Sequence, residues 1–369
     1  MSQAMISFDR VSKRFSGTTD AAVENLSLDI ERGETVVLVG PSGCGKTTTM
    51  KMINRLIEPS DGRIMVDGTD VLEQDPVRLR RGIGYVIQSI GLMPHRTVAE
   101  NIATVPKLIG WDESKIKSRI HALVEVFELD ANMLSRYPGE LSGGQRQRVG
   151  VARALAADPP VMLMDEPFGA VDPIVRERLQ DQFRDIQKRL RKTIVFVTHD
   201  IDEAIKMADR IVILNKGAVI EQYDSPAEIL RNPASDFVSR FVGAERGLKR
   251  LALVKVSDID VEDGPVVRMS DSRETALQVM EDCATPWATV VDADGRLHGW
   301  IDAAMLSGAS NVGSVAARKF SAYVTAESSL RNALDSIVTS RTQVAVVADE
   351  NDHYRGILSL ERISKEIIS

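Results

Sequence analysis

The stretch TVVLVGPSGCGKTTT, residues 35–49, decides the fold class. Its opening run of β-branched and apolar residues predicts a buried strand. Gly40–Thr47 then matches the spacing G-x-x-x-x-G-K-[ST], in which Gly43 and Gly45 let backbone amides converge on phosphate oxygens. The helix that follows adds the positive end of its dipole. Strand, glycine-rich turn and helix in this order predict a phosphate-binding loop in an α/β fold.

The chemistry of this loop assigns further roles. Lys46 is expected to bridge the terminal phosphates of a nucleotide, and the Thr47 hydroxyl is expected to bind Mg²⁺. The sequence therefore predicts ATP and Mg²⁺ as the cofactors.

A second apolar run, VMLMDEP at residues 161–167, ends in two acids that packing alone does not explain. Asp165 fits the carboxylate that orients Mg²⁺ and its waters. Glu166 fits a base that polarises the water attacking the γ-phosphate. The two runs together predict an ATP-hydrolysing site.

Composition narrows the class of protein. The chain has 369 residues, 43% of them hydrophobic and 27% charged, with no low-complexity tract, which predicts folded domains throughout. A formal net charge of −7 argues against a nucleic-acid partner. No run of about 18 apolar residues and no signal-peptide pattern occurs, so we expect a cytosolic chain. Cys44 and Cys283 lie far apart in sequence, and no disulfide is expected.

Strand-like and helix-like segments alternate up to about residue 210, which predicts a parallel sheet covered by helices. The pattern then changes. We predict a nucleotide-binding domain over 1–240, a linker over 241–252, and two C-terminal repeats over 253–309 and 310–369.

The C-terminal third repeats itself at an offset of 57 residues. ETALQVM (274–280) aligns with RNALDSI (331–337), and TVVDADGRLHGWID (289–302) aligns with VVADENDHYRGILS (346–359), which superposes Gly299 on Gly356. Two copies predict a pseudo-symmetric pair packed together.

The run ELSGGQRQRVGVARAL, residues 140–155, resembles the signature of ATP-binding-cassette (ABC) ATPases. Ser142, Gly143 and Gly144 precede a helix, so their hydroxyl and amides form a second anion site. In the family, the signature of one subunit closes over the nucleotide held by the P-loop of the other. The resemblance therefore implies a homodimer in which Ser142–Gln145 act in trans.

Other residues take their expected roles from the same resemblance. Phe15 resembles the aromatic that stacks on adenine, and Gln88 resembles the residue that senses Mg²⁺ and water. His199 resembles the switch histidine that contacts the γ-phosphate, and Asp172 resembles the acid of a dimer-contacting loop. The expected nucleotide-binding set is Phe15, Gly40, Pro41, Ser42, Gly43, Cys44, Gly45, Lys46, Thr47 and Thr48. The expected catalytic set is Glu166, His199 and Gln88, and the expected metal set is Thr47, Gln88 and Asp165.

The C-terminal repeat resembles a tandem cystathionine-β-synthase (CBS) pair, an α+β regulatory module. A cassette followed by such a pair resembles the ATPase of quaternary-amine, or osmoprotectant, importers. That family takes up glycine betaine, choline, carnitine or proline betaine. The resemblance implies an ABC cassette with a parallel core sheet and antiparallel and helical subdomains, placed at the cytoplasmic face of the inner membrane. The implied partners are two permease subunits and an extracytoplasmic solute-binding protein. The alternatives are the ATPase of an amino-acid or polyamine importer, and a soluble ABC ATPase without a permease.

The CBS pair departs from nucleotide-binding members of its family. These tend to carry a Thr and an Asp at the end of each repeat, whereas the matching positions here are Asp302 and Met305, then Ser359 and Arg362. The usual ribose contact is therefore not expected. Sensing of ionic strength, binding of a cyclic dinucleotide, and simple dimerisation stay open as roles for the pair.

Overall fold

The computed structural model describes residues 4–87, 91–169, 171–320 and 323–368. Its contacts divide the chain into two compact units, residues 1–242 and 243–369.

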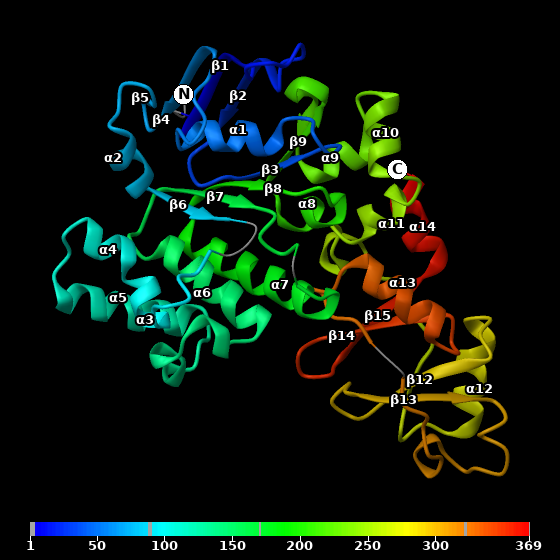
Figure 1. The fold of residues 1–369 in the computed structure, drawn as a ribbon. Coiled ribbons are helices and arrows are strands. Elements are labelled where there is room, and N and C mark those ends of the chain that lie inside the picture. The colour runs from blue at the N-terminus through cyan, green and yellow to red at the C-terminus, as the bar shows by residue number, and fades with distance from the viewer. Residues whose placement is uncertain (1–3, 88–90, 170, 321–322, 369) are drawn as a thin grey trace. The chain divides into compact units, whose positions relative to one another are not determined.

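The first unit contains two sheets (Figure 1). The larger sheet has the strand order β10-β9-β3-β8-β7-β6. All neighbours in it are parallel except β9 and β10, which form an antiparallel hairpin. Its strands are β3 (Thr35–Val39), β6 (Ile83–Val86), β7 (Val161–Asp165), β8 (Thr193–Val197), β9 (Arg210–Asn215) and β10 (Val219–Asp224).

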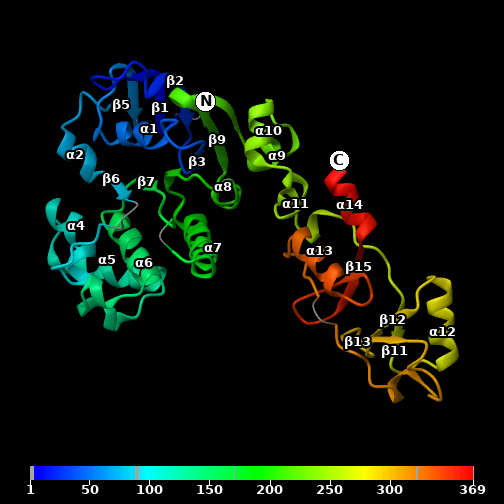
Figure 2. The same ribbon diagram turned by 45° about the vertical axis from the view of Figure 1, so that its right-hand side comes forward.

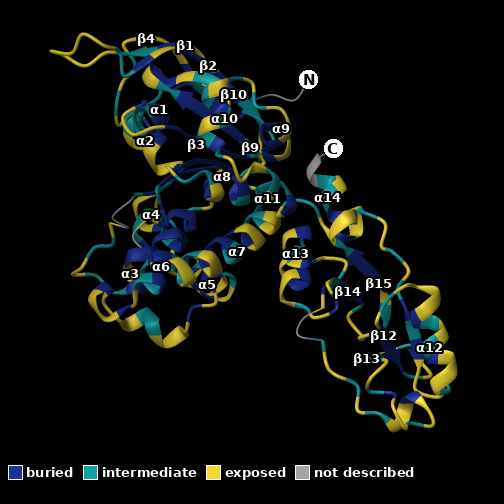
Figure 3. Cartoon of the chain, turned by 90° about the vertical axis from the view of Figure 1, so that its right-hand side faces the viewer, coloured by how far each residue is buried: buried dark blue, intermediate teal, exposed yellow. Residues whose placement is uncertain are grey.

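Strands β3, β7 and β8 are buried along their whole length, as expected for central strands of a parallel sheet covered on both faces. Figure 3 shows the interior of this unit in the colour of buried residues. Because β3 pairs with β8 and β8 pairs with β7, the carboxyl ends of these three strands lie at one edge of the sheet. The segments that follow them are therefore brought together.

The smaller sheet is antiparallel, with the order β2-β1-β4-β5. Its strands are β1 (Ile6–Lys13), β2 (Val23–Ile30), β4 (Asp61–Val66) and β5 (Thr69–Asp70). Helix α1 (Lys46–Ile53) contributes Met50, Met52 and Ile53 to a core that also includes side chains of both sheets. This packing anchors the helix that begins at the glycine-rich turn.

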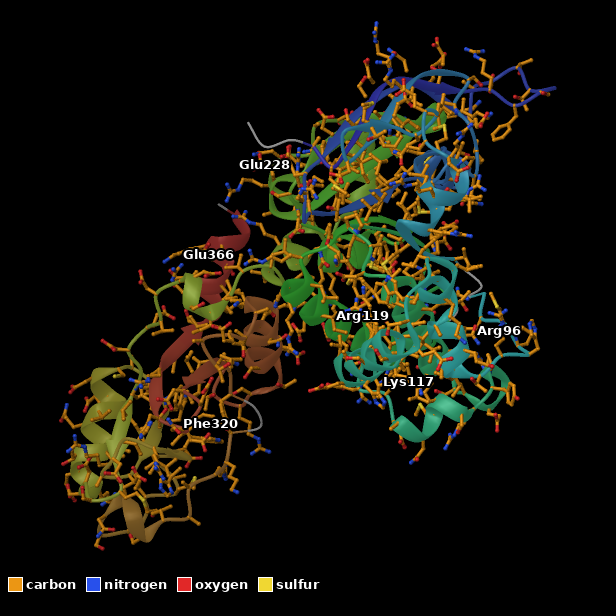
Figure 4. The ribbon with its side chains drawn as sticks, turned by 90° about the vertical axis from the view of Figure 1, so that its left-hand side faces the viewer. Arg96, Lys117, Arg119, Glu228, Phe320 and Glu366 are labelled. Atoms are coloured by element: carbon orange, nitrogen blue, oxygen red, sulfur yellow. The ribbon has the colours of Figure 1, made fainter. Side chains whose placement is uncertain are left out.

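The remaining helices of the first unit surround the sheets or form a separate helical group. They are α2 (Pro76–Arg81), α3 (Val98–Ile102), α4 (Thr104–Leu108), α5 (Glu113–Val126), α6 (Gly143–Leu155), α7 (Pro173–Leu190), α8 (Ile201–Met207), α9 (Pro226–Arg231) and α10 (Asp236–Val242). Helices α3–α6 gather to one side of the larger sheet (Figure 1). Arg119 of α5, labelled in Figure 4, donates to the Leu155 carbonyl at 2.9 Å and so caps the end of α6.

The second unit contains two similar halves (Figure 2). The first half has β11 (Val266–Arg268), α12 (Arg273–Asp282), β12 (Trp287–Val291) and β13 (Leu297–Asp302), and the second has α13 (Leu330–Thr339), β14 (Val344–Ala348), β15 (Tyr354–Ser359) and α14 (Leu360–Ile368). Helix α11 (Arg246–Leu251) lies inside the segment predicted as a linker, and its Leu251 is buried in the core of the second half.

The two halves exchange their leading segments. Val256 packs into the core of the second half, whereas Val312 packs into the core of the first. Glu262 pairs with Ile357, and Arg318 pairs with Trp300, so each hairpin receives a strand-like segment from the other half. The predicted pair of packed copies is therefore interleaved rather than merely adjacent.

Candidate functional site

The turn between β3 and α1 requires glycine for a physical reason. Gly45 has φ +112°, and a Cβ atom there would lie 2.4 Å from the Ala22 carbonyl oxygen. Gly43 also has a positive φ, with open space around its α-carbon. The turn can therefore adopt its shape and present its backbone only with glycines at these positions.

Lys46 begins α1 beneath this turn and is 7% exposed. Its ammonium donates to the carbonyl oxygens of Gly40 at 2.8 Å and Pro41 at 2.9 Å. The loop thus encloses a buried positive charge, which suits a polyphosphate. Pro41 and Ser42 are exposed, Cys44 is buried, and Thr48 is half-buried in the first turn of the helix.

Thr47 and Asp165 meet across the edge of the larger sheet. The Thr47 hydroxyl lies 3.1 Å from Asp165 Oδ1, although 118 residues separate them in sequence. Burial raises the pKa of Asp165, and the hydrogen bond from Thr47 and the charge of Lys51 only partly oppose this effect. A carboxylate in this position would be stabilised by a bound cation.

Glu166 and His199 form a second contact at the same edge. His199 Nδ1 lies 3.0 Å from Glu166 Oε1. Glu166 has φ +44°, a left-handed conformation that is strained for a residue with a side chain, and its N–H donates to the Val197 carbonyl at 2.9 Å. The strained turn directs the carboxylate away from the end of β7 toward the histidine that follows β8.

The signature segment is locked by reciprocal capping. The Ser142 hydroxyl accepts from the Gln145 N–H at 3.3 Å, and Gln145 Oε1 accepts from the Ser142 N–H at 2.8 Å. A Cβ atom on Gly144 would lie 3.0 Å from Val175 of α7, whereas one on Gly143 would meet nothing within 4 Å. Gly144 is therefore needed for packing within the chain, and Gly143 faces open space.

Phe15 and Asp172 each make a local contact. Phe15 is 41% exposed in the loop after β1, and the Lys13 ammonium lies 5.2 Å from its ring centroid. Asp172 caps α7 by accepting from the Val175 N–H at 3.1 Å. Gln88 lies outside the described residues.

One buried acid next to this site was not singled out from the sequence. Glu203 of α8 is 7% exposed and accepts from Gln180 of α7 at 2.9 Å. The sequence shows an acid four residues after His199, but a charged residue on a helix is usually exposed, and no local pattern marks the face of α8 that packs against α7. Only the fold shows that this face is buried.

The described residues offer neither a clustered metal site nor a membrane-spanning helix. No group of three or more His, Cys, Asp or Glu side chains there is arranged to hold a metal ion. Within the same residues, no helix combines the length and apolar character needed to cross a membrane.

Comparisons with known proteins cover both units. An ABC transporter family model matches residues 23–169, and a CBS domain model matches residues 312–369. The chain is 48% identical over 361 residues to the glycine betaine/carnitine/choline transport ATP-binding protein OpuCA of Bacillus subtilis, covering 96% of this chain and 94% of the relative. It is 46% identical over 370 residues to the osmoprotectant import ATP-binding protein OsmV of Salmonella typhimurium, covering 99% of this chain and 97% of the relative.

Solved structures resemble the first unit. A dimeric bacterial ABC transporter cassette superposes with a TM-score of 0.54 at 33% identity, covering 60% of this chain and 99% of that chain. A dimeric post-hydrolysis state of the same cassette, bound to ADP and Pi, gives a TM-score of 0.54 at 32% identity with the same coverage.

Proposed function

The chain belongs to the family of ABC ATP-binding subunits of quaternary-amine and osmoprotectant importers, and we propose that it powers the uptake of a quaternary-amine compatible solute. This membership confirms the predicted fold class, an ABC cassette followed by a CBS module, and the predicted ATPase activity. The observation that carries the proposal is similarity over the whole chain. Relatives that act in glycine betaine, carnitine, choline and osmoprotectant transport align with both units and not with the cassette alone.

We assign ATP to the loop between β3 and α1, with Lys46 on its terminal phosphates and Phe15 against its adenine. In this assignment Glu166 acts as the base, and the nearby His199 holds the carboxylate and contacts the γ-phosphate. The 3.0 Å contact between Glu166 and His199 supports these roles, because a base must be held within reach of its water.

The residues present fit Mg²⁺. The Thr47 hydroxyl and the Asp165 carboxylate are hard oxygen donors 3.1 Å apart, and few protein ligands are needed because phosphates and waters complete the shell. Burial raises the pKa of Asp165, so a cation here would relieve an unfavourable charge. When bound, Mg²⁺ neutralises charge on the phosphates. Gln88 belongs to this proposed set by its place in the sequence.

We further propose that two copies of the chain share two sites. Ser142, Gly143, Gly144 and Gln145 of one copy would face the nucleotide of the other, and Asp172 would contact the partner. The support comes from the capped start of α6, with Gly143 open to the outside, and from the dimeric state of the similar cassette.

The proposed partners are two permease subunits and a solute-binding protein, which would place the chain at the cytoplasmic face of the membrane. The proposed domains are those predicted from the sequence: 1–240, 241–252, 253–309 and 310–369.

The CBS pair is proposed to regulate the cassette. The residues at the positions of the usual ribose contact are engaged within the chain. Asp302 accepts from the Met305 N–H at 2.9 Å, and Ser359 accepts from the Arg362 N–H at 3.1 Å. These matching caps at the ends of β13 and β15 favour a role other than the usual adenosine contact.

The test is ATP-dependent uptake of radiolabelled glycine betaine and choline into vesicles that hold the full complex, over a range of internal salt. A chain ending at Val242, the limit of the first unit, serves as the comparison. Uptake that responds to salt only with the full chain is expected. Uptake of neither compound alongside normal ATPase activity would contradict the proposed solute class.

A further inference from the structure

Glu203 places a carboxylate in the interior between α7 and α8. It accepts from Gln180 Nε2 at 2.9 Å, and Gln180 itself is 6% exposed. The Thr198 hydroxyl, at the end of β8, also hydrogen-bonds this carboxylate. Burial raises the pKa of Glu203, which the hydrogen bonds from Thr198 and Gln180 oppose. Burial of an ionised carboxylate costs free energy, so we looked for a role of Glu203 that offsets this cost.

On one side, Glu203 is linked through Thr198 to the switch histidine, His199. Thr198 is 1% exposed and immediately precedes His199, whose ring lies 3.0 Å from Glu166. The Thr198 hydroxyl also accepts from the Asp200 N–H at 3.1 Å, which holds the turn into α8. The Glu203 carboxylate therefore interacts with the residue directly before His199.

On the other side, Glu203 is linked through helix α7 to the loop that carries Asp172. Arg176 lies one turn before Gln180 on α7, and its Nη2 donates to the Val171 carbonyl at 3.0 Å. The positive charge of Arg176 acts on Glu203 and lowers its pKa, against the effect of burial. Arg176 Nε is buried and has no hydrogen-bond partner among the described residues, so attraction to the buried carboxylate helps to hold this guanidinium.

We propose that Glu203 is a positioning residue that couples the loop of His199 to the loop of Val171 and Asp172. It acts through Thr198 on one side and through Gln180 and Arg176 on the other. Since α7 and α8 begin at these two loops, a shift of Asp172 on contact with a partner would be passed to the position of His199 near the base. This inference rests on the roles proposed above for His199 and Asp172.

The first test is Glu203→Gln in the full chain. The amide preserves size but removes the negative charge that acts on Arg176. We expect kcat for ATP hydrolysis to fall about tenfold, with KM for ATP changed by less than about twofold, because the nucleotide contacts are untouched. The matched control is Asp181→Asn, which breaks a half-buried ion pair (2.8 Å to Lys206) between the same two helices. It should leave kcat unchanged.

The second test is a double-mutant cycle with Arg176→Met. If both residues act along one path, the double variant should be no more than about twofold slower than the slower single variant. Losses that multiply would overturn the proposal, as would an equal loss in Asp181→Asn or a rise in KM without a fall in kcat.

Gln180→Met provides a second variant in case Glu203→Gln lowers the stability of the fold. It removes only the hydrogen-bond donor on α7, and it should reproduce the loss in kcat. A normal kcat in that variant would also count against the coupling. Failure of the proposed function would give a different result. In that case Glu166→Gln would retain ATP hydrolysis, whatever the effect of the Glu203 variants.

Discussion

At the scale of single residues, the site depends on two acids in succession with different surroundings. Asp165 is buried beside Thr47, whereas Glu166 leaves the strand in a strained conformation and meets His199. The strained backbone turns the two carboxylates toward different neighbours, as required by the roles proposed for them, one on a cation and the other on a water molecule.

Replacement of Glu166 by glutamine is the direct test of the base. The amide cannot take a proton, so phosphate release should fall by about 100-fold or more, while ATP binding persists. Size-exclusion chromatography with ATP should then show a trapped dimer. Ordinary turnover in this variant would remove the assignment of Glu166.

Replacement of Asp165 by asparagine separates function from stability. Burial raises the pKa of Asp165 above its unfolded value, so its ionised form destabilises the nucleotide-free fold at neutral pH. The variant should therefore gain about 1 kcal/mol in free energy of unfolding at pH 7, yet lose Mg²⁺-dependent hydrolysis. The gain should shrink as the pH falls through the raised pKa, where the wild-type acid becomes neutral. Denaturant titrations at several pH values, without nucleotide, would check this, and a destabilised variant would contradict it.

At the scale of elements, the start of α6 distinguishes contacts within the chain from contacts across a dimer. Gly144 packs against α7, so any side chain there disturbs the fold as well as the proposed shared site. Gly143 has open space around it, so a substitution there tests the contact with the second copy without disturbing packing within the chain.

Gly143→Asp should leave the isolated chain stable, since an acid in the first turn of a helix is favourable. In the shared site it would place a carboxylate beside the γ-phosphate, so hydrolysis should fall at least about tenfold. Thermal unfolding and phosphate release, measured together, test this. Near-normal hydrolysis with an unchanged melting temperature would count against the shared site.

At the scale of the whole molecule, the second unit depends on the exchange between its halves. Gly299 has φ +143°, and a Cβ atom there would lie 2.2 Å from the Arg318 carbonyl oxygen of the exchanged segment. Gly356 meets the Glu262 carbonyl in the same way, at 2.8 Å. The glycines that the repeat superposes are thus the points where each hairpin receives the other half.

Gly299→Ala should destabilise the second unit by about 3 kcal/mol, since the added methyl group overlaps backbone that cannot move alone. Gly295→Ala is the matched control: its φ of +83° is also strained, but nothing lies within 4 Å. It should cost about 1 kcal/mol. Because the units are compact by themselves, calorimetry should show only the transition of the second unit shifting, with ATPase activity retained. Equal effects of the two variants would contradict the exchange.

Much of the site was predictable because its signals are local. The spacing of Gly40–Thr47 specifies a phosphate-binding turn by itself, and Asp165 and Glu166 stand out as charges at the end of an apolar run. The 57-residue offset predicted two packed copies. It did not predict that Val256 would lie in the core of the second half and Val312 in the core of the first.

The sequence by itself determined the family, the nucleotide chemistry and the duplication, because each is written in residues a few positions apart. Only the tertiary structure decided which of these residues meet. Strand order brings Thr47 to Asp165 and Glu166 to His199, and helix packing buries Glu203 against Gln180. Such contacts join segments far apart in the chain, and they form only when the hydrophobic faces of strands and helices pack into one core.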